Sequence, residues 1–351
     1  MNKSLMSIFI TILVIISVPQ TKCSAQVQLK VGGYMQTWLI LNQHQEYGEE
    51  NTDTWGFRIR RARLTGQTDL ADMFQVVTWI EFSGPQRHLL DFYITAKISP
   101  AFNIRLGQFR APGQMYYTGI LSSSQLIIYE RPAISTRLSG YMGYDSFRDI
   151  GLQVTGFAGP VWYGLYMGNG MGRFTQAGSN IASRDFGGGL YGGRIDINPT
   201  KGLIIGAHFA MNKQSNVIRD GSNPYDIDRT SYSFRFATDN LLIPGLFTES
   251  ELGGGVVDDT DTFDYNGWYI QAGYRLSDAL SFVTRYDFLK ENDAMNTVNE
   301  EQNLTFGLVY YRMHNNKEII RMGANYSFGD SKPGGLNRNI FLLWVQVRFI
   351  P

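Results

Sequence analysis

The stretch Trp55-Gly-Phe-Arg-Ile-Arg-Arg-Ala-Arg-Leu64 carries the residues best suited to hold an anion. Guanidinium groups stay charged and offer planar pairs of N–H donors, so a cluster of them attracts carboxylates and phosphates. In a regular strand, Arg58 and Arg60 would face one side, whereas Arg61 and Arg63 would face the other. A β-bulge at Arg60–Arg61 would insert one residue and bring all four arginines to the same side. We expect this bulge, with the opposite side formed by Phe57, Ile59, Ala62 and Leu64.

Other charged residues fall on the predicted inner face of neighbouring strands. The basic ones are Lys97, Arg105, Arg235, Arg275, Arg285 and Arg321, and the acidic ones are Glu81, Asp91 and Asp287. We expect Lys97 and Arg105 to attract anions together with the four arginines of the cluster. The alternative is that the arginines only pair with acids such as Glu81 or Asp91 and are structural.

The long connection from Arg110 to Phe147 is a second candidate for function. Connections of this length are usually functional or disordered. The apolar run Leu126-Ile-Ile-Tyr129 and several tyrosines favour an ordered segment. We expect it to fold into a lumen and narrow it, with an external cap as the alternative. The residues expected at this constriction are Arg110, Tyr116, Tyr117, Arg131 and Arg137.

The elements that must position these residues are strands, because apolar and polar residues alternate with period two. Near the end of the chain, Phe341, Leu343, Val345, Val347 and Phe349 alternate with Leu342, Trp344, Gln346 and Arg348. Such runs are about ten residues long, which is the length that a tilted strand needs to cross a bilayer. Strands of a soluble β-sandwich are nearer five or six residues, roughly. We therefore predict an all-β fold, a transmembrane antiparallel β-barrel.

The alternation predicts about sixteen strands, an even number as in single-chain bacterial barrels. Their predicted ranges are 27–41, 55–68, 73–83, 87–98, 102–109, 148–157, 161–169, 188–197, 202–213, 229–239, 246–257, 267–276, 280–289, 301–312, 318–329 and 340–349. Short links alternate with longer ones, as periplasmic turns alternate with external loops in such barrels. We predict one transmembrane β-barrel domain over residues 26–351, with the long inward-folded loop after the fifth strand.

The first 25 residues are predicted to be a cleaved signal peptide. Lys3 precedes an apolar core, and Cys23-Ser24-Ala25 places small residues at a cleavage site. The core is too short for a membrane-spanning helix, which takes about 20 residues. Cleavage after Ala25 removes the single cysteine of the chain. The mature protein is then expected to have neither a disulfide nor a thiolate metal site.

The composition excludes several classes of function. Lysine and arginine number 31, as do aspartate and glutamate, so no basic excess favours a nucleic-acid partner. The four histidines lack metal-ligand spacing, so we expect no metal site and no cofactor. Ser83 and His88 are the one local pairing that a lipolytic enzyme could use, and no motif supports them. We therefore expect no enzymatic activity.

Four motifs resemble the phosphate-selective porin O and P family. They are Phe57-Arg-Ile-Arg-Arg-Ala-Arg-Leu64, Leu106-Gly-Gln-Phe-Arg-Ala-Pro112, Tyr129-Glu-Arg-Pro132 and Arg148-Asp-Ile-Gly-Leu-Gln153. They occur in the family's order, and the likeness covers nearly the whole mature chain. The resemblance implies a sixteen-stranded, trimeric, anion-selective porin with an inward-folded third loop. The founding members use lysine and arginine at the constriction, whereas the candidate loop here contains no lysine.

Together these features predict a porin of the Gram-negative outer membrane for passive diffusion of small solutes. We expect a bias toward anions, phosphate or other small anions among them, through an arginine-lined lumen. The expected partners are small solutes, outer-membrane lipids and further copies of the chain in a homotrimer. The alternative is a general, sugar or zwitterion diffusion porin with structurally paired arginines, in which Tyr116, Tyr117 and Trp79 offer stacking surfaces.

Overall fold

The structure is a computed structural model. It describes residues 28–45, 52–71, 73–84, 87–111, 125–129, 131–142, 148–170, 172–173, 189–217, 225–258, 262–293, 298–315, 317–332 and 337–349. The predicted signal peptide, Tyr116 and Tyr117 lie outside the described residues. No described helix is long and apolar enough to cross a membrane.

Sixteen strands and one helix are found in the described ranges. The strands of the first half are β1 (Leu29–Gln45), β2 (Thr52–Leu70), β3 (Phe74–Glu81), β4 (His88–Ser99), β5 (Phe102–Arg110), β6 (Arg148–Ala158), β7 (Val161–Gly168) and β8 (Gly189–Thr200). Those of the second half are β9 (Leu203–Val217), β10 (Tyr225–Asp239), β11 (Leu246–Asp258), β12 (Thr262–Ser277), β13 (Leu280–Asp293), β14 (Val298–His314), β15 (Lys317–Lys332) and β16 (Asn337–Phe349). The helix α3 (Ala133–Tyr141) lies between β5 and β6 in the chain.

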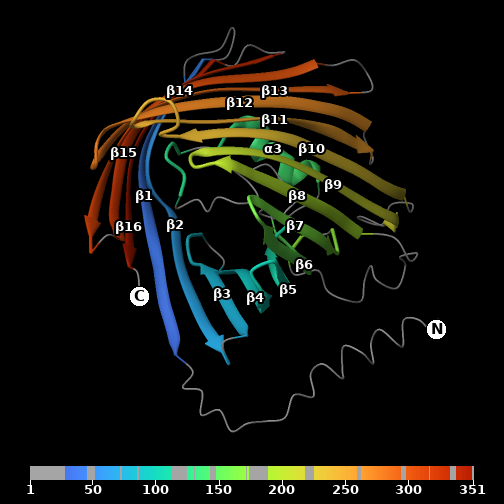
Figure 1. Cartoon of the computed structure of the whole chain (residues 1–351). Helices are drawn as coiled ribbons and strands as arrows, with labels where there is room; N and C mark the ends of the chain where they lie inside the picture. Colours follow the sequence, from blue (N-terminus) through green and yellow to red (C-terminus); the bar gives the residue numbers. More distant parts are fainter. Residues whose placement is uncertain are drawn as a thin grey trace, which may run out of the picture.

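The strands form one closed antiparallel barrel (Figure 1). Each strand pairs with the next along the chain, and β1 also pairs with β16. Closure leaves no unpaired sheet edge. In a bilayer this is essential, because an unpaired backbone group there has no water to bond. The predicted antiparallel barrel of about sixteen strands is confirmed.

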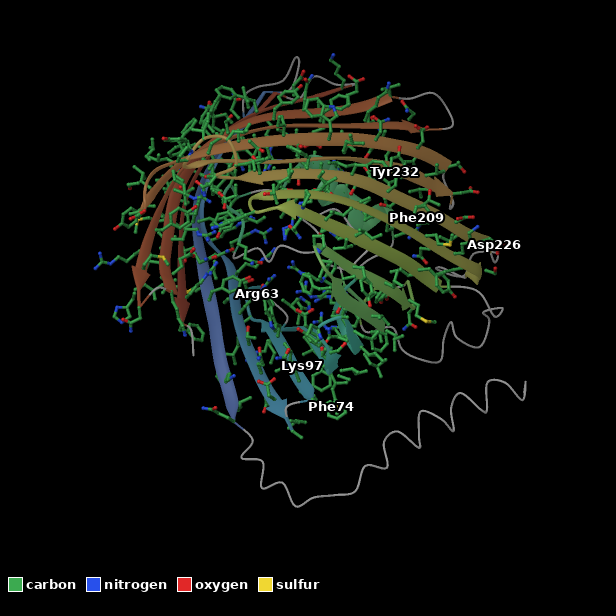
Figure 2. All side chains as sticks on the ribbon, viewed as in Figure 1. Arg63, Phe74, Lys97, Phe209, Asp226 and Tyr232 are labelled. Carbon is green, nitrogen blue, oxygen red and sulfur yellow. The ribbon has the colours of Figure 1, made fainter. Side chains whose placement is uncertain are left out.

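The outer surface of the barrel is apolar, and much of the inner surface is polar. In β12, the outward Ile270 is 52% exposed and the inward Gln271 is 1% exposed. Phe209 and Tyr232, labelled in Figure 2, are paired across β9 and β10 and belong to the exposed outer set. An exposed apolar surface of this extent fits contact with lipid rather than water. The predicted alternation is confirmed.

The β-bulge predicted in β2 is present. Gln36 of β1 pairs with Arg61, and the next residue of β1 pairs with Ile59, so Arg60 is an extra residue in β2. Paired residues of an antiparallel sheet share a face, so Arg61 lies on the inner face with Gln36. Ile59 stays on the outer face and is 58% exposed.

Several strands extend beyond their predicted ranges at the long-loop end. β12 begins at Thr262, where the alternation predicts residue 267, and β10 begins at Tyr225 instead of residue 229. The extra part of β12 contains Asp264 and Asn266, which interrupt an apolar outer face. Backbone pairing does not require that face to be apolar once a strand has left the lipid. The periodicity therefore predicts the membrane-spanning part of each strand better than its full length.

A hydrophobic core lies inside the barrel, where the alternation predicts a mainly polar face. Leu342 and Trp344 of β16 point inward and are buried in this core. The segment after β5 contributes Leu126, Tyr129, Ala133, Ile134, Leu138 and Met142. Within the barrel, α3 lies against β12, β13 and β14 (Figure 1). The described part of the connection thus packs on the inner wall, and its narrowing of a pore stays a prediction.

The apolar outer face generates a test of the membrane position. Ile270 lies midway along β12, so we expect Ile270→Arg to lower the free energy of unfolding by about 2–4 kcal/mol. Thr262→Arg, at the loop end of the same strand, should cost about 0–1 kcal/mol because the charge reaches water. Urea unfolding of the barrel in lipid vesicles measures both. Equal costs for the two variants would contradict a lipid belt centred on Ile270.

Candidate functional site: an arginine-lined cavity in the lumen

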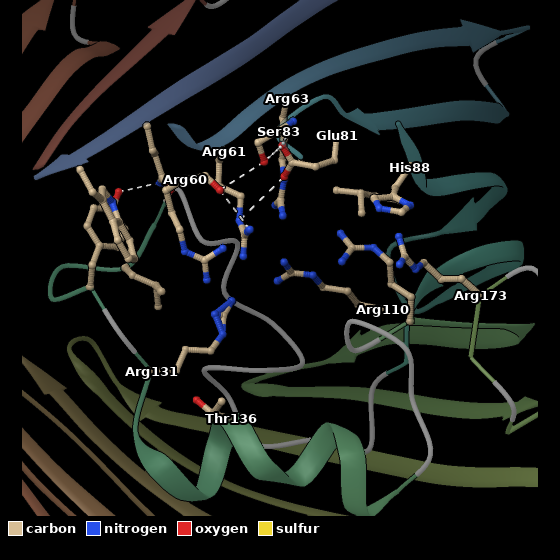
Figure 3. A pocket seen from close by; sticks show the side chains of 16 residues that line it. Arg60, Arg61, Arg63, Glu81, Ser83, His88, Arg110, Arg131, Thr136 and Arg173 are labelled. Atoms are coloured by element: carbon tan, nitrogen blue, oxygen red, sulfur yellow. Dashed lines mark hydrogen bonds and ion pairs between the residues drawn. The ribbon is translucent and has the colours of Figure 1, made fainter. Parts of the chain in front are cut away.

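A cavity of about 500 Å³ lies beside the inner faces of β2, β3 and β5 (Figure 3). Seven of the described residues that line it are arginines, namely Arg60, Arg61, Arg63, Arg110, Arg131, Arg148 and Arg173. Glu81 is the one carboxylate among those described lining residues. Neutral and apolar lining comes from Gln36, Trp38, Ser83, Leu90, Leu126, Tyr129 and Thr136, with His88. Strands and loops far apart in sequence therefore converge on a strongly positive cavity.

Trp38 of β1 carries two arginines of β2 on its ring. The guanidinium of Arg58 lies 4.8 Å from the ring centre, and that of Arg60 lies 5.0 Å from it. A guanidinium over an indole face gains cation–π stabilisation. The Trp38 ring therefore helps to hold these two positive charges at the inner wall.

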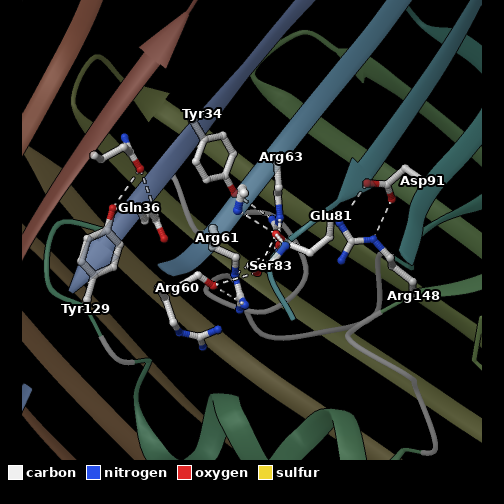
Figure 4. Close-up of polar contacts among 12 residues, drawn as sticks. Tyr34, Gln36, Arg60, Arg61, Arg63, Glu81, Ser83, Asp91, Tyr129 and Arg148 are labelled. Atoms are coloured by element: carbon white, nitrogen blue, oxygen red, sulfur yellow. Dashed lines mark hydrogen bonds and ion pairs between the residues drawn. The ribbon is translucent and has the colours of Figure 1, made fainter. Parts of the chain in front are cut away.

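Glu81 of β3 organises the other two arginines of the bulge (Figure 4). Its Oε2 accepts a hydrogen bond from Arg63 Nε at 2.7 Å and lies 3.8 Å from Arg61 Nε. Its Oε1 accepts hydrogen bonds from the Ala62 backbone N–H at 2.8 Å and from the Ser83 hydroxyl at 2.7 Å. Hydrogen bonds to a charged group are strong and directional. One acid thus fixes the geometry of the bulge while it offsets a single positive charge.

Arg148 of β6 reaches across β5 to Asp91 of β4. Its Nε and Nη2 each donate to one carboxylate oxygen of Asp91 at 2.9 Å (Figure 4). Both side chains are buried, with exposed fractions of 2% and 8%. Arg110 is the partner of Arg148 in the β5–β6 register and lines the same cavity. Asp91 therefore offsets one of two adjacent positive charges.

Tyr129 fixes the segment after β5 to the barrel wall. Its hydroxyl accepts a hydrogen bond from Gln36 Nε2 at 2.7 Å and donates to Gln346 Oε1 at 2.9 Å. Burial raises the pKa of Tyr129, so the hydroxyl keeps the proton that it donates. Asn325 Nδ2 donates to the Tyr129 carbonyl at 2.9 Å. The chain that leads to Arg131 is thus held by β1, β15 and β16.

A wall carboxylate also fixes the start of α3. The backbone N–H of Ala133 donates to Asp287 Oδ1 at 2.8 Å, which satisfies one of the N–H groups that a helix start leaves without an acceptor. Arg285 Nε lies 3.2 Å from Asp287 Oδ2 and holds that carboxylate. Between the Tyr129 contacts and this one, Arg131 points its guanidinium into the cavity (Figure 3).

Arg173 reaches the cavity from the turn after β7, which the buried Asp149 holds in place. Asp149 Oδ2 accepts hydrogen bonds from the Gly170 N–H at 2.7 Å and the Tyr166 hydroxyl at 2.9 Å. Its Oδ1 accepts a hydrogen bond from the Gly172 N–H at 3.2 Å. The backbone amides of Gly170 and Gly172 thus bind the Asp149 carboxylate of the same chain. The sequence pattern alone did not indicate Arg173, because its approach depends on this turn.

The opposite wall carries arginines that lie beside acids. The nitrogen–oxygen distances are 2.9 Å for Arg194–Asp196, 2.6 Å for Arg235–Glu249 and 3.2 Å for Arg285–Asp287, and Arg321 pairs with Glu318. Among the described lining residues, positive charge therefore exceeds negative charge beside β2, β3 and β5, whereas these pairs on β8–β15 are balanced. Such a distribution produces an electric field across the lumen.

The structure separates the predicted site residues into groups. Arg60, Arg61, Arg63, Arg110 and Arg131 line the cavity, with Arg58 beside them on Trp38. Lys97 lies near the short-turn end, 2.7 Å from Asp69, and Arg105 stacks at 4.2 Å on Tyr93 of the inner wall. Arg137 lies on an exposed part of α3, 3.7 Å from Glu301.

Ser83 and His208, which are residue types used in enzymatic or metal chemistry, form hydrogen bonds within the barrel wall. Ser83 donates its hydroxyl to Glu81 Oε1, so its proton is directed away from His88. His208 lies in the inner wall between Ser231, at 3.0 Å from Nε2, and Ser233. Among the side chains that the structure describes, no group of three His, Cys, Asp or Glu residues is placed to hold a metal ion.

Comparison with known proteins identifies the fold. No family model matches this chain, and no curated protein sequence matches it. The anion-selective porin from Comamonas acidovorans is 14% identical, with a TM-score of 0.66 and coverage of 92% of this chain and 100% of that one. The outer membrane channel DcaP of Acinetobacter baumannii and the outer membrane protein OmpT of Vibrio cholerae are each 13% identical. Both have a TM-score of 0.64 and cover 95% of this chain and 100% of their own.

The chain therefore has the fold of outer-membrane porins. Its closed antiparallel barrel and apolar outer surface place it in the outer membrane of a Gram-negative bacterium. Membership of the phosphate-selective porin O and P family stays a prediction, since the structural likeness establishes the fold.

The buried ion pair in the cavity wall generates a stability prediction. Asp91→Ala should lower the free energy of unfolding by about 3–5 kcal/mol, because it leaves the buried Arg148 charge without its bidentate partner. The control is Asp69→Ala, which removes the partner of Lys97 at an exposed site and should cost about 0–1 kcal/mol. Urea unfolding followed by gel mobility of the folded barrel compares them. A cost for Asp91→Ala no larger than the control would show that water already solvates Arg148.

Proposed function

We propose that this chain is a porin for the passive diffusion of small solutes with a bias toward anions. The observation that carries the proposal is the cavity lining, with seven arginines and one carboxylate among its described residues. Among the described residues, Glu81 and Asp91 form ion pairs with arginines of this lining. Because seven of the described lining residues are positively charged, the local potential attracts anions and raises their concentration.

The geometry suits transient binding of a passing anion. Arg61 Nε is buried and makes no hydrogen bond within the described part of the chain, and its nearest acid oxygen is 3.8 Å away. A donor in this state can bind an anion oxygen without first breaking a strong ion pair. Conduction requires that binding be favourable enough to enter and weak enough to leave. A cavity lined by several guanidiniums meets both conditions, and phosphate is one anion that it would accept.

The alternative proposal is a general porin for neutral or zwitterionic solutes with structurally paired arginines. The balanced pairs on the opposite wall, such as Arg235–Glu249 and Arg194–Asp196, favour it. Charge selectivity separates the two proposals, because a balanced lumen gives little preference between anions and cations.

We further propose a homotrimer embedded in outer-membrane lipids and exported with residues 1–25 as its signal peptide. One of the similar OmpT structures is described as a trimer form. The proposed activity needs neither a catalytic step nor a cofactor, and nucleic acid is no partner in it.

Removal of one cavity charge should weaken the anion preference. We expect Arg61→Ala to lower the anion-to-cation permeability ratio about sevenfold, because one charge about 7 Å from an ion in water contributes about 0.6 kcal/mol in favour of an anion and as much against a cation. The measurement is the reversal potential in a planar bilayer under a salt gradient, with and without added phosphate. Lys97→Ala, an equal charge change outside the cavity lining, is the control and should shift the potential less. A wild-type pore without anion preference would contradict the proposal, and so would equal shifts of the reversal potential in the two variants.

Removal of the cavity carboxylate should act in the opposite direction. Glu81→Gln removes a negative charge but keeps an amide oxygen for Ala62 and Ser83. We expect the anion-to-cation permeability ratio to rise about sevenfold by the same Coulombic argument. A fall in the ratio would mean that Glu81 acts mainly by orienting Arg61 and Arg63.

A further inference from the structure

A second cavity, of about 420 Å³, lies in the lumen near the short-turn end of β8–β12. The inward side chains that matter for its chemistry are Asn198, Arg235, Phe247, Glu249, Gln271 and Arg275. It shares no described lining residue with the arginine-lined cavity. The described groups that line the two cavities are therefore different.

The segment after β5 separates the two cavities. Leu126 lines the arginine-lined cavity, whereas Gln125 and Ile127 line the second one. Arg321 Nη1 donates to the Leu126 carbonyl at 3.0 Å and so fixes this segment to β15. The two cavities thus lie on different sides of one fixed piece of chain.

The charged groups of the second cavity are neutralised in pairs. Arg235 Nε lies 2.6 Å from Glu249 Oε1, and Arg275 Nη1 lies 2.6 Å from Asp239 Oδ1. Arg275 also lies over the Phe247 ring, 5.0 Å from its centre. Equal numbers of opposite charges at contact distance give little net attraction for either an anion or a cation.

Gln271 provides a hydrogen-bond acceptor that the described chain does not satisfy. The residue is 1% exposed, and its buried Oε1 has no hydrogen-bond partner among the described residues. Buried polar groups are normally hydrogen-bonded, so a donor from solute or water is expected there. Asn198 adds an amide group that both donates and accepts. Ile204 and Phe247 add apolar surface beside them.

We propose that this second cavity is a binding subsite for a neutral solute rich in hydroxyl groups, such as a small sugar. A hydroxyl both donates and accepts, which matches the amides of Gln271 and Asn198. The C–H groups of a sugar pack on Ile204, and the balanced ion pairs do not require a charged ligand. The subsite goes beyond the proposed passage of anions, because its ligand carries no charge.

The test is a calorimetric titration of the folded full-length barrel in detergent with D-glucose, which measures the affinity for glucose. Gln271→Met keeps the length of the side chain and removes the acceptor, so glucose should bind roughly 3- to 10-fold more weakly. The matched control is Gln153→Met, which changes a glutamine on the inner wall of β6 outside both cavities and should leave binding unchanged. Asn198→Ala, at an exposed position, should weaken binding roughly threefold and remains informative if Gln271→Met does not fold.

The outcomes distinguish this subsite from the anion cavity. Absence of glucose binding to the unsubstituted barrel would mean that only water fills the cavity and would overturn the subsite. Equal binding by the control and by both cavity variants would overturn it as well. Reversal potentials of the same proteins report on the arginine-lined cavity. The two proposals can therefore fail independently of each other.

Discussion

The hydrogen-bonded closure of β1 onto β16 is the constraint on which the rest of this structure depends. In lipid, a strand edge cannot be satisfied by water, so the sheet must close on itself. Closure also fixes which face each residue occupies, because the side-chain period is two and a slip of one residue would exchange the faces. That is why Ile270 and Val345 lie in the exposed apolar belt, whereas their neighbours Gln271 and Gln346 are buried inside.

The bulge at Arg60 is a local departure from this constraint that shapes the cavity. A strictly paired β2 would turn part of its arginine cluster toward lipid, which costs about 2–4 kcal/mol for each charge near the midplane. The extra residue shifts the phase, and Trp38 and Glu81 then stabilise the shifted arginines by a ring contact and by ion pairing. Seven of the described residues that line the cavity at this wall are arginines, while Arg194 and Arg235 opposite have acids beside them.

The hydrophobic core inside the barrel separates the two cavities of the lumen. Trp344 and Leu342 point inward and pack with Tyr129, Ile134 and Leu138 of the segment after β5. Once that segment is held by Gln36, Gln346 and Asp287, it carries Arg131 to one cavity and Ile127 to the other. A charged compartment and a charge-balanced one thereby share a single barrel.

The strands, their even number and their two faces follow from the amino-acid sequence alone, because side chains that alternate with period two face lipid on one side and the lumen on the other. The bulge also follows from the sequence, since the four arginines from Arg58 to Arg63 cannot all face the lumen without one. Which charges lie together depends on the folded barrel. Arg148 forms an ion pair with Asp91 across β5, and the turn held by Asp149 places Arg173 in the lining of the arginine-lined cavity. The tertiary structure also decided that the inward Trp344 belongs to a core inside the barrel. These contacts join strands and loops far apart in the chain, and only closure of the barrel sets the distances between them.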